Sequence, residues 1–326
     1  MAASVVASIA LPISNNFSFA PSMDAYGKLS EYGKLGAWSP LSLFAASEVG
    51  AWYDPSDLST MFQDSAGTTP VTADGQPVGL ILDKSQGLAL GPELATNGDF
   101  SNGTTGWVPN TGVSLSNVSN QLVQTSTSIG WLSSFLHVTG VTPGNTYKIS
   151  IDVVGGSVSS SRYINVGTNG GGYNIFQTPI LSNGTLVCYA TATLNYFDIG
   201  TECFFNNIGD TVILDNFSVK LISGNHATQA TAASRPLKTS TGLSKWIDYD
   251  AVDDALNVTF PSSLGSNCTV CRANPGSTPT ILTGQTIGTS YADSTDHAGL
   301  IIINRALTGQ ETTDVTEWLT DKGVFF

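Results

Sequence analysis

The stretch Tyr147-Lys-Ile-Ser-Ile-Asp-Val153 decides the fold class of the middle of this chain. Tyr147, Ile149, Ile151 and Val153 alternate with polar residues, and successive side chains of a β-strand point to opposite faces of its sheet. The pattern predicts a strand with one face in a hydrophobic core and the other in solvent.

The same alternation recurs on both sides of this stretch. Leu186 to Ala192 and Phe217 to Leu221 repeat it, and Gly155-Gly156 and Asn169 to Gly172 provide turns between such segments. Several short strands separated by Gly- and Asn-rich turns are typical of a β-sandwich or jelly roll. We therefore expect residues 94–222 to form one such module.

Composition supports a folded, mainly β protein of about two domains. The chain has 326 residues, of which 41% are hydrophobic and only 11% are charged. Disordered chains have low hydrophobicity, which excludes disorder as the general state. The net charge is −13 with only 12 Lys and Arg. We expect no nucleic-acid partner, because nucleic-acid affinity depends on basic contacts.

The N-terminal segment, residues 1–38, is apolar and rich in Ala. It lacks the basic residues that open a secretory signal, and its longest apolar run, Val5 to Ile13, is too short to span a membrane. We expect no membrane insertion and interpret this segment as an arm that docks on a larger assembly or on another subunit. Ser39-Pro40 then predicts a short helix with Leu41, Phe44 and Ala45 on one face.

The clearest helix signal lies at the C-terminus. Thr308 and Glu311 have the spacing of a capping box. Val315 and Leu319 lie on one helical face, and Gly323 stands where a C-terminal cap is expected. The predicted fold class is therefore mainly β, with a jelly-roll insert in a second, discontinuous β-sandwich and a C-terminal helix.

Two separated stretches, Trp52 to Thr72 and Gly224 to Pro236, resemble a sequence pattern common in phage and prophage tail proteins. In that pattern the two stretches are near neighbours, whereas here about 138 residues separate Ser85 from Gly224. With Asp250 to Ala255 and Asn304 to Thr308, they resemble the laminin-G-like, concanavalin-A-like domains of phage structural proteins. The resemblance implies a host domain formed by residues 39–86 and 224–326.

The inserted residues 94–222 resemble carbohydrate-binding modules of the jelly-roll type. Asn97 to Phe100, followed by Trp107, looks like their first strand, and Leu214 to Val219 looks like their last. Adjacent first and last strands bring the two ends of an insert close together, which is what an insertion requires.

Glycan binding is the sharpest chemical hypothesis for the insert. Sugars stack on aromatic rings and bind amides and hydroxyls. The candidate site residues are Trp131, Tyr163, Tyr173 and Asn174, and the alternative is that these side chains fill the core or turns. Trp107 is expected in the core.

No cofactor is required by any motif, but a structural calcium ion is one hypothesis. By resemblance to jelly-roll modules, Asp99 and Asp215 stand where an ion ties the first strand to the last, and carboxylates suit Ca²⁺. The alternative is that both are turn or surface carboxylates.

Other reactive residues give weaker signals. Cys268 and Cys271 have C-x-x-C spacing, interpreted as two thiols on a strand turn rather than as a zinc or redox site. Cys188 and Cys203 are expected either to pair or to be buried free thiols.

His226 is assigned to a turn and His297 to a polar turn. Asp253-Asp254 are expected on opposite faces of a strand, unable to flank one glycosidic bond. We expect no enzyme activity.

The leading functional hypothesis is a non-catalytic structural component of a bacteriophage particle: a tail-tip, fibre or decoration protein. It would assemble in the host cytoplasm into the virion and bind other virion proteins. It would form a homo-oligomer such as a trimer and display the insert toward a host surface glycan. The alternatives are a free glycan-binding protein and a polysaccharide-degrading enzyme.

Overall fold

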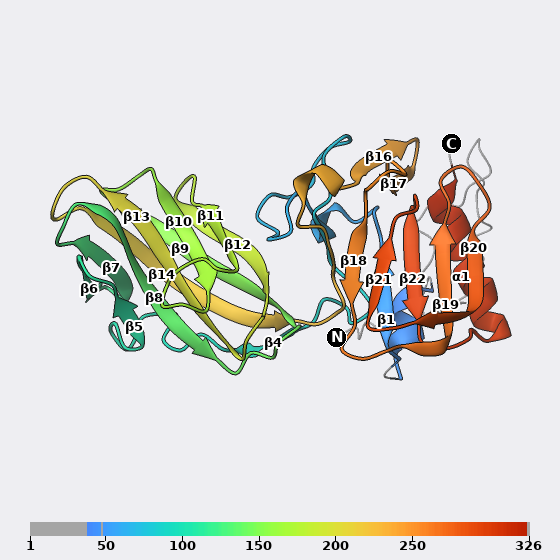
Figure 1. Cartoon of the computed structure of the whole chain (residues 1–326), viewed down its shortest axis with the longest axis horizontal. Helices are drawn as coiled ribbons and strands as arrows, with labels where there is room; N and C mark the ends of the chain where they lie inside the picture. The colour runs from blue at the N-terminus through green and yellow to red at the C-terminus, as the bar shows by residue number, and fades with distance from the viewer. Residues whose placement is uncertain (1–37, 47, 325–326) are drawn as a thin grey trace, which may run out of the picture. The chain divides into compact units, whose positions relative to one another are not determined.

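Antiparallel strands dominate the structure, a computed structural model that describes residues 38–46 and 48–324 (Figure 1). The prediction of a mainly β chain with a C-terminal helix is confirmed. The predicted arm, residues 1–38, lies outside the described residues except for Trp38. Within the described residues no helix is both long and apolar enough to cross a membrane.

The inserted segment forms two sheets that face each other. The first has the strand order β11-β10-β13-β8-β5, and the second the order β12-β9-β14-β7-β6, with β4 also pairing with β14. The strands of the first sheet are β5 (Trp107–Pro109), β8 (Gly130–Thr139), β10 (Arg162–Gly167), β11 (Phe176–Pro179) and β13 (Tyr196–Phe205). Those of the second are β4 (Leu90–Glu93), β6 (Val113–Val118), β7 (Gln121–Ser126), β9 (Thr146–Gly156), β12 (Gly184–Thr191) and β14 (Thr211–Ile222).

The alternation noted in the sequence produces the core between these sheets. Tyr147, Ile149, Ile151 and Val153 on β9 are all buried in one cluster. Trp107 is buried in the same core, with its ring 5.2 Å from that of Phe217. The segment Gln86 to Glu93, which lies between the predicted host and insert residues, is ordered in part as β4. Its Glu93 lies opposite Lys220 on β14.

The other strands form a second sandwich from residues on both sides of the insert. One sheet has the order β1-β22-β19-β20 and the other β2-β3-β15-β18-β21, with a small β16-β17 ribbon beside them. The bounds are β1 (Gly50–Tyr53), β2 (Met61–Phe62), β3 (Leu80–Ile81), β15 (Ala227–Thr228), β16 (Leu237–Thr241), β17 (Ser244–Asp248), β18 (Leu256–Thr259), β19 (Gly265–Ala273), β20 (Thr280–Ile287), β21 (Ser290–Asp293) and β22 (Gly299–Ile303). Short 3-10 helices span Pro40–Phe44, Leu58–Thr60 and Ala232–Ser234.

A buried carboxylate joins the two halves of this host sandwich. Asp83 is fully buried; its Oδ1 accepts hydrogen bonds from the backbone N–H groups of Trp52 and Ser85, both at 2.8 Å. Its Oδ2 accepts from the Ser85 hydroxyl and from the N–H of Asn225, both at 2.7 Å. The Asp83 N–H donates to Nδ1 of His226 at 2.9 Å. His226, assigned to a turn from sequence, is thus buried and accepts a backbone hydrogen bond from across the insertion point.

Two strands on either side of the insert also pair with each other. β3 precedes the insert and β15 follows it, yet Ile81 lies opposite Ala227 and Leu80 opposite Thr228. The Gly224 backbone approaches Asp83 so closely that a β-carbon there would lie 3.0 Å from the Asp83 carbonyl oxygen. The two segments that flank the insert in sequence are thus adjacent in space.

We expect Asp83→Asn to lower the free energy of unfolding at pH 7.5 by at least about 2 kcal/mol. Burial raises the pKa of Asp83 to about 6, so the wild-type group is ionised at this pH and its two oxygens accept four donors. An amide turns one of those acceptors into a donor facing other donors. Chemical denaturation measures the loss.

Asp99→Asn is the matched control for this experiment, measured in EDTA. Asp99 accepts from the N–H and hydroxyl of Ser101, as Asp83 does from those of Ser85, but it is exposed. The control is expected to change stability little. Equal losses for the two variants, or none for Asp83→Asn, would contradict a special role for the buried carboxylate.

The C-terminal helix α1 (Gly309–Gly323) packs against β17, β19 and β22. The predicted capping box of Thr308 and Glu311 is confirmed. Gly299 on β22 has no side chain because the Trp318 ring lies there: a β-carbon would be 2.6 Å from it. Gly323 was predicted as the cap but is the last helical residue, where a β-carbon would lie 2.7 Å from the Asn274 carbonyl oxygen.

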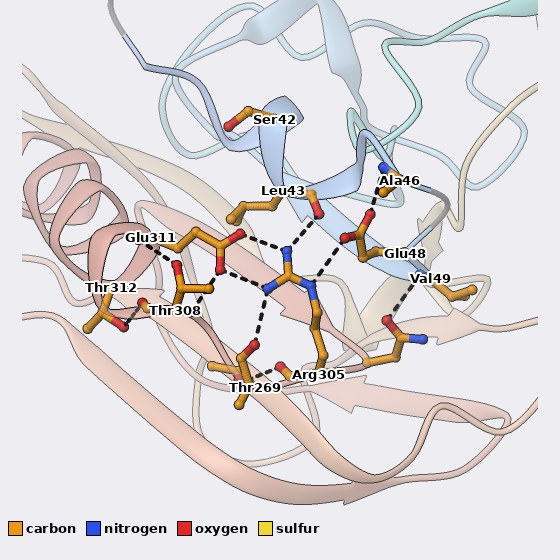
Figure 2. A network of polar contacts seen from close by, with 12 residues as sticks. Ser42, Leu43, Ala46, Glu48, Val49, Thr269, Arg305, Thr308, Glu311 and Thr312 are labelled. Atoms are coloured by element: carbon orange, nitrogen blue, oxygen red, sulfur yellow. Dashed lines mark hydrogen bonds and ion pairs between the residues drawn. The ribbon is translucent and has the colours of Figure 1, made fainter.

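Arg305 connects the start of α1 to the first described segment of the chain (Figure 2). Its guanidinium group donates two 2.8 Å hydrogen bonds to Glu311, one of 3.2 Å to Glu48 and one of 3.4 Å to the Leu43 carbonyl. Such a two-pronged pairing with a carboxylate is the strong geometry for arginine.

The first short helix differs from its prediction. Pro40–Phe44 is a 3-10 helix, which has three residues per turn rather than 3.6, so Pro40, Leu43 and Phe44 are buried while Leu41 is exposed. The predicted N-cap is confirmed, since Ser39 accepts from the Leu41 N–H at 3.3 Å.

The Arg305–Glu311 pair predicts an acid-sensitive contribution to stability. The hydrogen bonds from Arg305 lower the pKa of Glu311 from 4.5 to about 2. The contribution is therefore present above about pH 4.5 and is lost as the pH falls through about 2. Thermal unfolding of wild type and Glu311→Gln should show a wild-type advantage at pH 7 that disappears near pH 2. An advantage that stays constant across this range would contradict the assignment.

Candidate functional site

The outer face of the five-stranded sheet of the insert carries a group of aromatic rings. Side chains that alternate with core residues on β8, β10 and β13 point to this face. Trp131 lies directly opposite Phe204, and its ring centroid is 5.3 Å from that of Phe204 and 5.5 Å from that of Tyr163. We call Trp131, Tyr163 and Phe204 the aromatic corner. Trp131 is 51% exposed, so this ring is available to a ligand.

A row of polar side chains lies next to the aromatic corner. Glu202 lies opposite Tyr163, and its Oε2 accepts from Nε2 of Gln177 at 2.8 Å and from Nδ2 of Asn165 at 3.3 Å. Gln177 also donates to Oδ1 of Asn165 at 3.0 Å. These bonds hold a half-buried carboxylate in one orientation beside the rings.

Residues 168–175 form a loop over the other end of this face. Asn165 donates from Nδ2 to the Gly171 carbonyl at 3.0 Å, and the Gly170 N–H donates to Asp198 at 2.7 Å. Gly171 has a φ of +88°, and a β-carbon there would lie 3.0 Å from the Phe135 ring. Glycine is therefore required where the loop meets the ring. The aromatic corner lies at the start of β8, at Trp131, whereas the loop lies over the later part of this strand, from Phe135 onward.

Asp198 and His137 form a pair at the loop end of the face. His137 Nδ1 lies 2.7 Å from Oδ1 of Asp198, and the His137 ring is 4.8 Å from that of Tyr196. The Tyr196 hydroxyl donates to the Thr168 carbonyl at 3.1 Å. The pair thus serves to hold the loop.

The structure separates the four candidate glycan-binding residues. Trp131 and Tyr163 meet in the aromatic corner. Tyr173 is 55% exposed but lies on the loop. Asn174 closes that loop, since its Oδ1 accepts from the Thr168 N–H at 2.7 Å and its Nδ2 donates to Oγ1 of Thr168 at 3.0 Å. A turn role suits Asn174 better than ligand contact.

Sequence reasoning missed Phe204, Glu202 and Gln177. The strand β13 does not alternate clearly, because Asp198 and Gly200 on its outer face are buried under the loop and under Phe135. Gln177 lies on a short strand ending in Pro179. The alternation of Glu202 and Phe204 with Cys203 was the one available signal.

Asp99 and Asp215 each accept hydrogen bonds from other residues of the insert. Asp215 accepts from the Asn216 N–H at 2.8 Å and from Gln121 at 3.4 Å. The calcium hypothesis for these two residues stays a prediction.

Another acidic group lies in the loop before β18, where the carboxylates of Asp250, Asp253 and Asp254 lie within 4.8 Å of one another. The expectation that Asp253 and Asp254 occupy opposite faces of a strand is wrong, because they precede the strand. Oδ1 of Asp250 accepts the N–H groups of residues 252–254, so the cluster is organised as a turn.

The four cysteines are buried and free. Cys188 and Cys203 lie on β12 and β13, in different sheets of the insert, while Cys268 and Cys271 lie on one strand, β19, rather than on a turn. Burial raises the pKa of Cys203 and of Cys271 to about 12. These groups are therefore thiols at neutral pH and pack as small hydrophobic side chains.

His297 belongs to a buried polar cluster in the host sandwich, not to a polar turn as predicted. It is 1% exposed, and its Nε2 lies 2.9 Å from Oδ2 of Asp293. Asp293 also accepts from Arg272 and from the Tyr249 hydroxyl. Burial raises the pKa of Asp293, but the interactions with His297, Arg272 and Tyr249 outweigh burial, so this pKa lies below its usual value. This cluster supports the core rather than a surface site.

Comparison with known proteins gives likenesses to solved structures at TM-scores below 0.5. No family model and no curated protein matches the chain. A tandem carbohydrate-binding domain, CBM22-1-CBM22-2 of Paenibacillus barcinonensis Xyn10C, is 14% identical, covering 68% of this chain and 94% of that chain at a TM-score of 0.34. The adhesin domain of Epf from Streptococcus pyogenes is 8% identical, covering 64% and 86% at a TM-score of 0.33.

An arabinose-bound α-L-arabinofuranosidase is 19% identical, covering 46% of this chain and 31% of that chain at a TM-score of 0.33. The match thus spans about a third of that enzyme.

Proposed function

We propose that the insert binds a neutral glycan, without cleaving it, on the outer face of its five-stranded sheet. The observation that carries this proposal is the aromatic corner of Trp131, Tyr163 and Phe204 next to the fixed carboxylate of Glu202. The apolar face of a sugar ring stacks on an aromatic ring, while its hydroxyl groups donate to a carboxylate or amide oxygen.

The site is organised before a ligand arrives. The rings lie on paired strands and contact each other, and Glu202 is held by Gln177 and Asn165. Binding therefore orders few side chains, which reduces its entropic cost.

Charge on this face supports a neutral ligand. Glu202 and Asp198 are its carboxylates, and the outward-facing residues of β8, β10, β11 and β13 include no Lys or Arg. An acidic sugar would meet negative charge on the face and across a chain of net charge −13.

The spacing of these carboxylates supports binding without hydrolysis. Asp198 and Glu202 are four residues apart on one strand, which separates them by about 13 Å at the usual rise per residue. Glycosidase carboxyl pairs lie about 5 to 9.5 Å apart.

The first test is an array of neutral and acidic oligosaccharides probed with the full chain. We expect binding to neutral oligosaccharides, and we expect Trp131→Ala to weaken it at least tenfold, which is about 1.4 kcal/mol or more. Titration calorimetry on an array-positive oligosaccharide gives the affinities.

Leu181→Ala, at an 86% exposed position, is the control and is expected to bind as wild type does. Tyr173→Ala tests the loop residue, with less effect expected than from Trp131→Ala. An unchanged affinity for Trp131→Ala, or wild-type binding confined to acidic sugars, would contradict the proposal.

We also propose that the protein displays this module on a bacteriophage particle, with other virion proteins as partners. The support is the resemblance of the host segments to phage structural domains, whose two halves meet at Asp83 and His226. A free glycan-binding protein is the alternative.

Purified particles labelled with an antibody against residues 94–222 distinguish these two. We expect label at a fixed place on each particle in negative-stain images. Unlabelled particles, with the protein free in the lysate, would favour the free glycan-binding protein.

A further inference from the structure

A long part of the insert has no acidic or basic side chain other than His137. From Phe100 to Tyr147 the sequence contains no Asp, Glu, Lys or Arg, although the chain carries a net charge of −13. This part includes β5 and β6, the strands that end the two sheets on one side. One edge of the module is therefore neutral.

The strand β6 is a regular edge strand (Figure 1). All six of its residues pair in register with β7, from Val113 opposite Ser126 to Val118 opposite Gln121. The two residues between them, Ser119 and Asn120, have φ values of 55° and 59°, as a tight type I′ hairpin turn requires. Among the described residues, no backbone partner outside β7 is seen for Leu115 to Val118.

Edge strands of this kind usually carry a protective feature, such as a charge, a proline, a bulge or a cover. Four other edge strands in the described part of the chain have one. β5 and β11 end in prolines, and β20 has an irregular register around Gly284, whose φ is +67°. β12 already donates a hydrogen bond from the Tyr189 N–H to the Ala66 carbonyl. β6 has no charged residue, proline or bulge, and no described backbone segment other than β7 pairs with it from Leu115 to Val118.

We propose that β6 is an interface between two copies of this chain, paired antiparallel with β6 of the second copy about a twofold axis. Two chains of like charge repel each other, and the repulsion is smallest where both surfaces are neutral. A second copy is therefore the occupant that fits: its neutral edge matches this one, and an isologous contact needs only one patch.

Side chains along β6 suit such pairing. Ser114, Ser116 and Val118 are exposed, small or β-branched, and lie on one face of the strand. Their opposite neighbours, such as Leu115, pack toward the core. Pairing joins two six-stranded sheets and gives the complex two aromatic corners, so a surface with many copies of a glycan would be held by both. That consequence rests on the proposed glycan site, whereas the interface does not.

The experiment is light scattering with size-exclusion chromatography on the full chain over a concentration series. The wild type is expected to shift from monomer to dimer as concentration rises. Ser114→Lys/Ser116→Lys and Ser114→Asp/Ser116→Asp should each weaken dimerisation at least tenfold, because like charges meet across the twofold axis. Mixing the two variants in equal amounts should restore a dimer of one copy of each.

Thr283→Lys on the exposed edge strand β20 is the matched control and should dimerise as wild type does. Circular dichroism establishes that all variants are folded. A wild type that stays monomeric, a mixture that does not associate, or loss of the dimer in Thr283→Lys but not in the β6 variants would overturn the proposal. Deletion of residues 1–37 should leave the dimer intact. Loss of the dimer on this deletion would overturn the proposal and identify residues 1–37 as the segment that makes the contact between copies.

Discussion

The buried carboxylate of Asp83 is the interaction on which the arrangement of the chain depends. It accepts hydrogen bonds from Trp52 and Ser85, before the insert, and from Asn225, after it. Loss of its donors lowers the free energy of unfolding more for a buried acceptor than for an exposed one, because water cannot replace the donors. The polypeptide can therefore leave the host sandwich and return over a hundred residues later, because both ends of the excursion are fixed to one side chain.

The two sandwiches on either side of this constraint have separate cores. The host sandwich is stabilised by its own core, by the buried cluster around Asp293 and by the contacts of Arg305. The insert has a separate core between its two sheets, which leaves the outer face of one sheet free to carry rings and amides. A ligand face on paired strands is more rigid than one built only from loops.

Much of the fold followed from local sequence pattern. The alternation of Tyr147 to Val153 predicted a half-buried strand because strand periodicity is strictly two, and the Thr308–Glu311 spacing predicted the start of the helix. Where a long-range contact decides the structure, sequence was less informative. Gly323 was misassigned because its role depends on the distant Asn274 carbonyl, and β4 was missed because its order comes from pairing with β14.

The candidate site shows the same division between local and long-range information. Trp131 and Tyr163 were selected from sequence as aromatic residues of the insert, but their proximity depends on β13 lying between β8 and β10. Phe204 and Glu202 could not be selected without that register. Asn174 looked like a ligand residue because amides bind sugars, yet the same amide groups close turns.

The central claim is that the aromatic corner is the ligand site, and chemical-shift mapping tests it most directly. The full chain, labelled with ¹⁵N and with ¹³C in its aromatic side chains, would be titrated with an array-positive oligosaccharide. We predict that the largest changes occur at the Trp131 indole and at the rings of Tyr163 and Phe204. Changes centred on Tyr173 and its loop, or on the host sandwich, would contradict the claim.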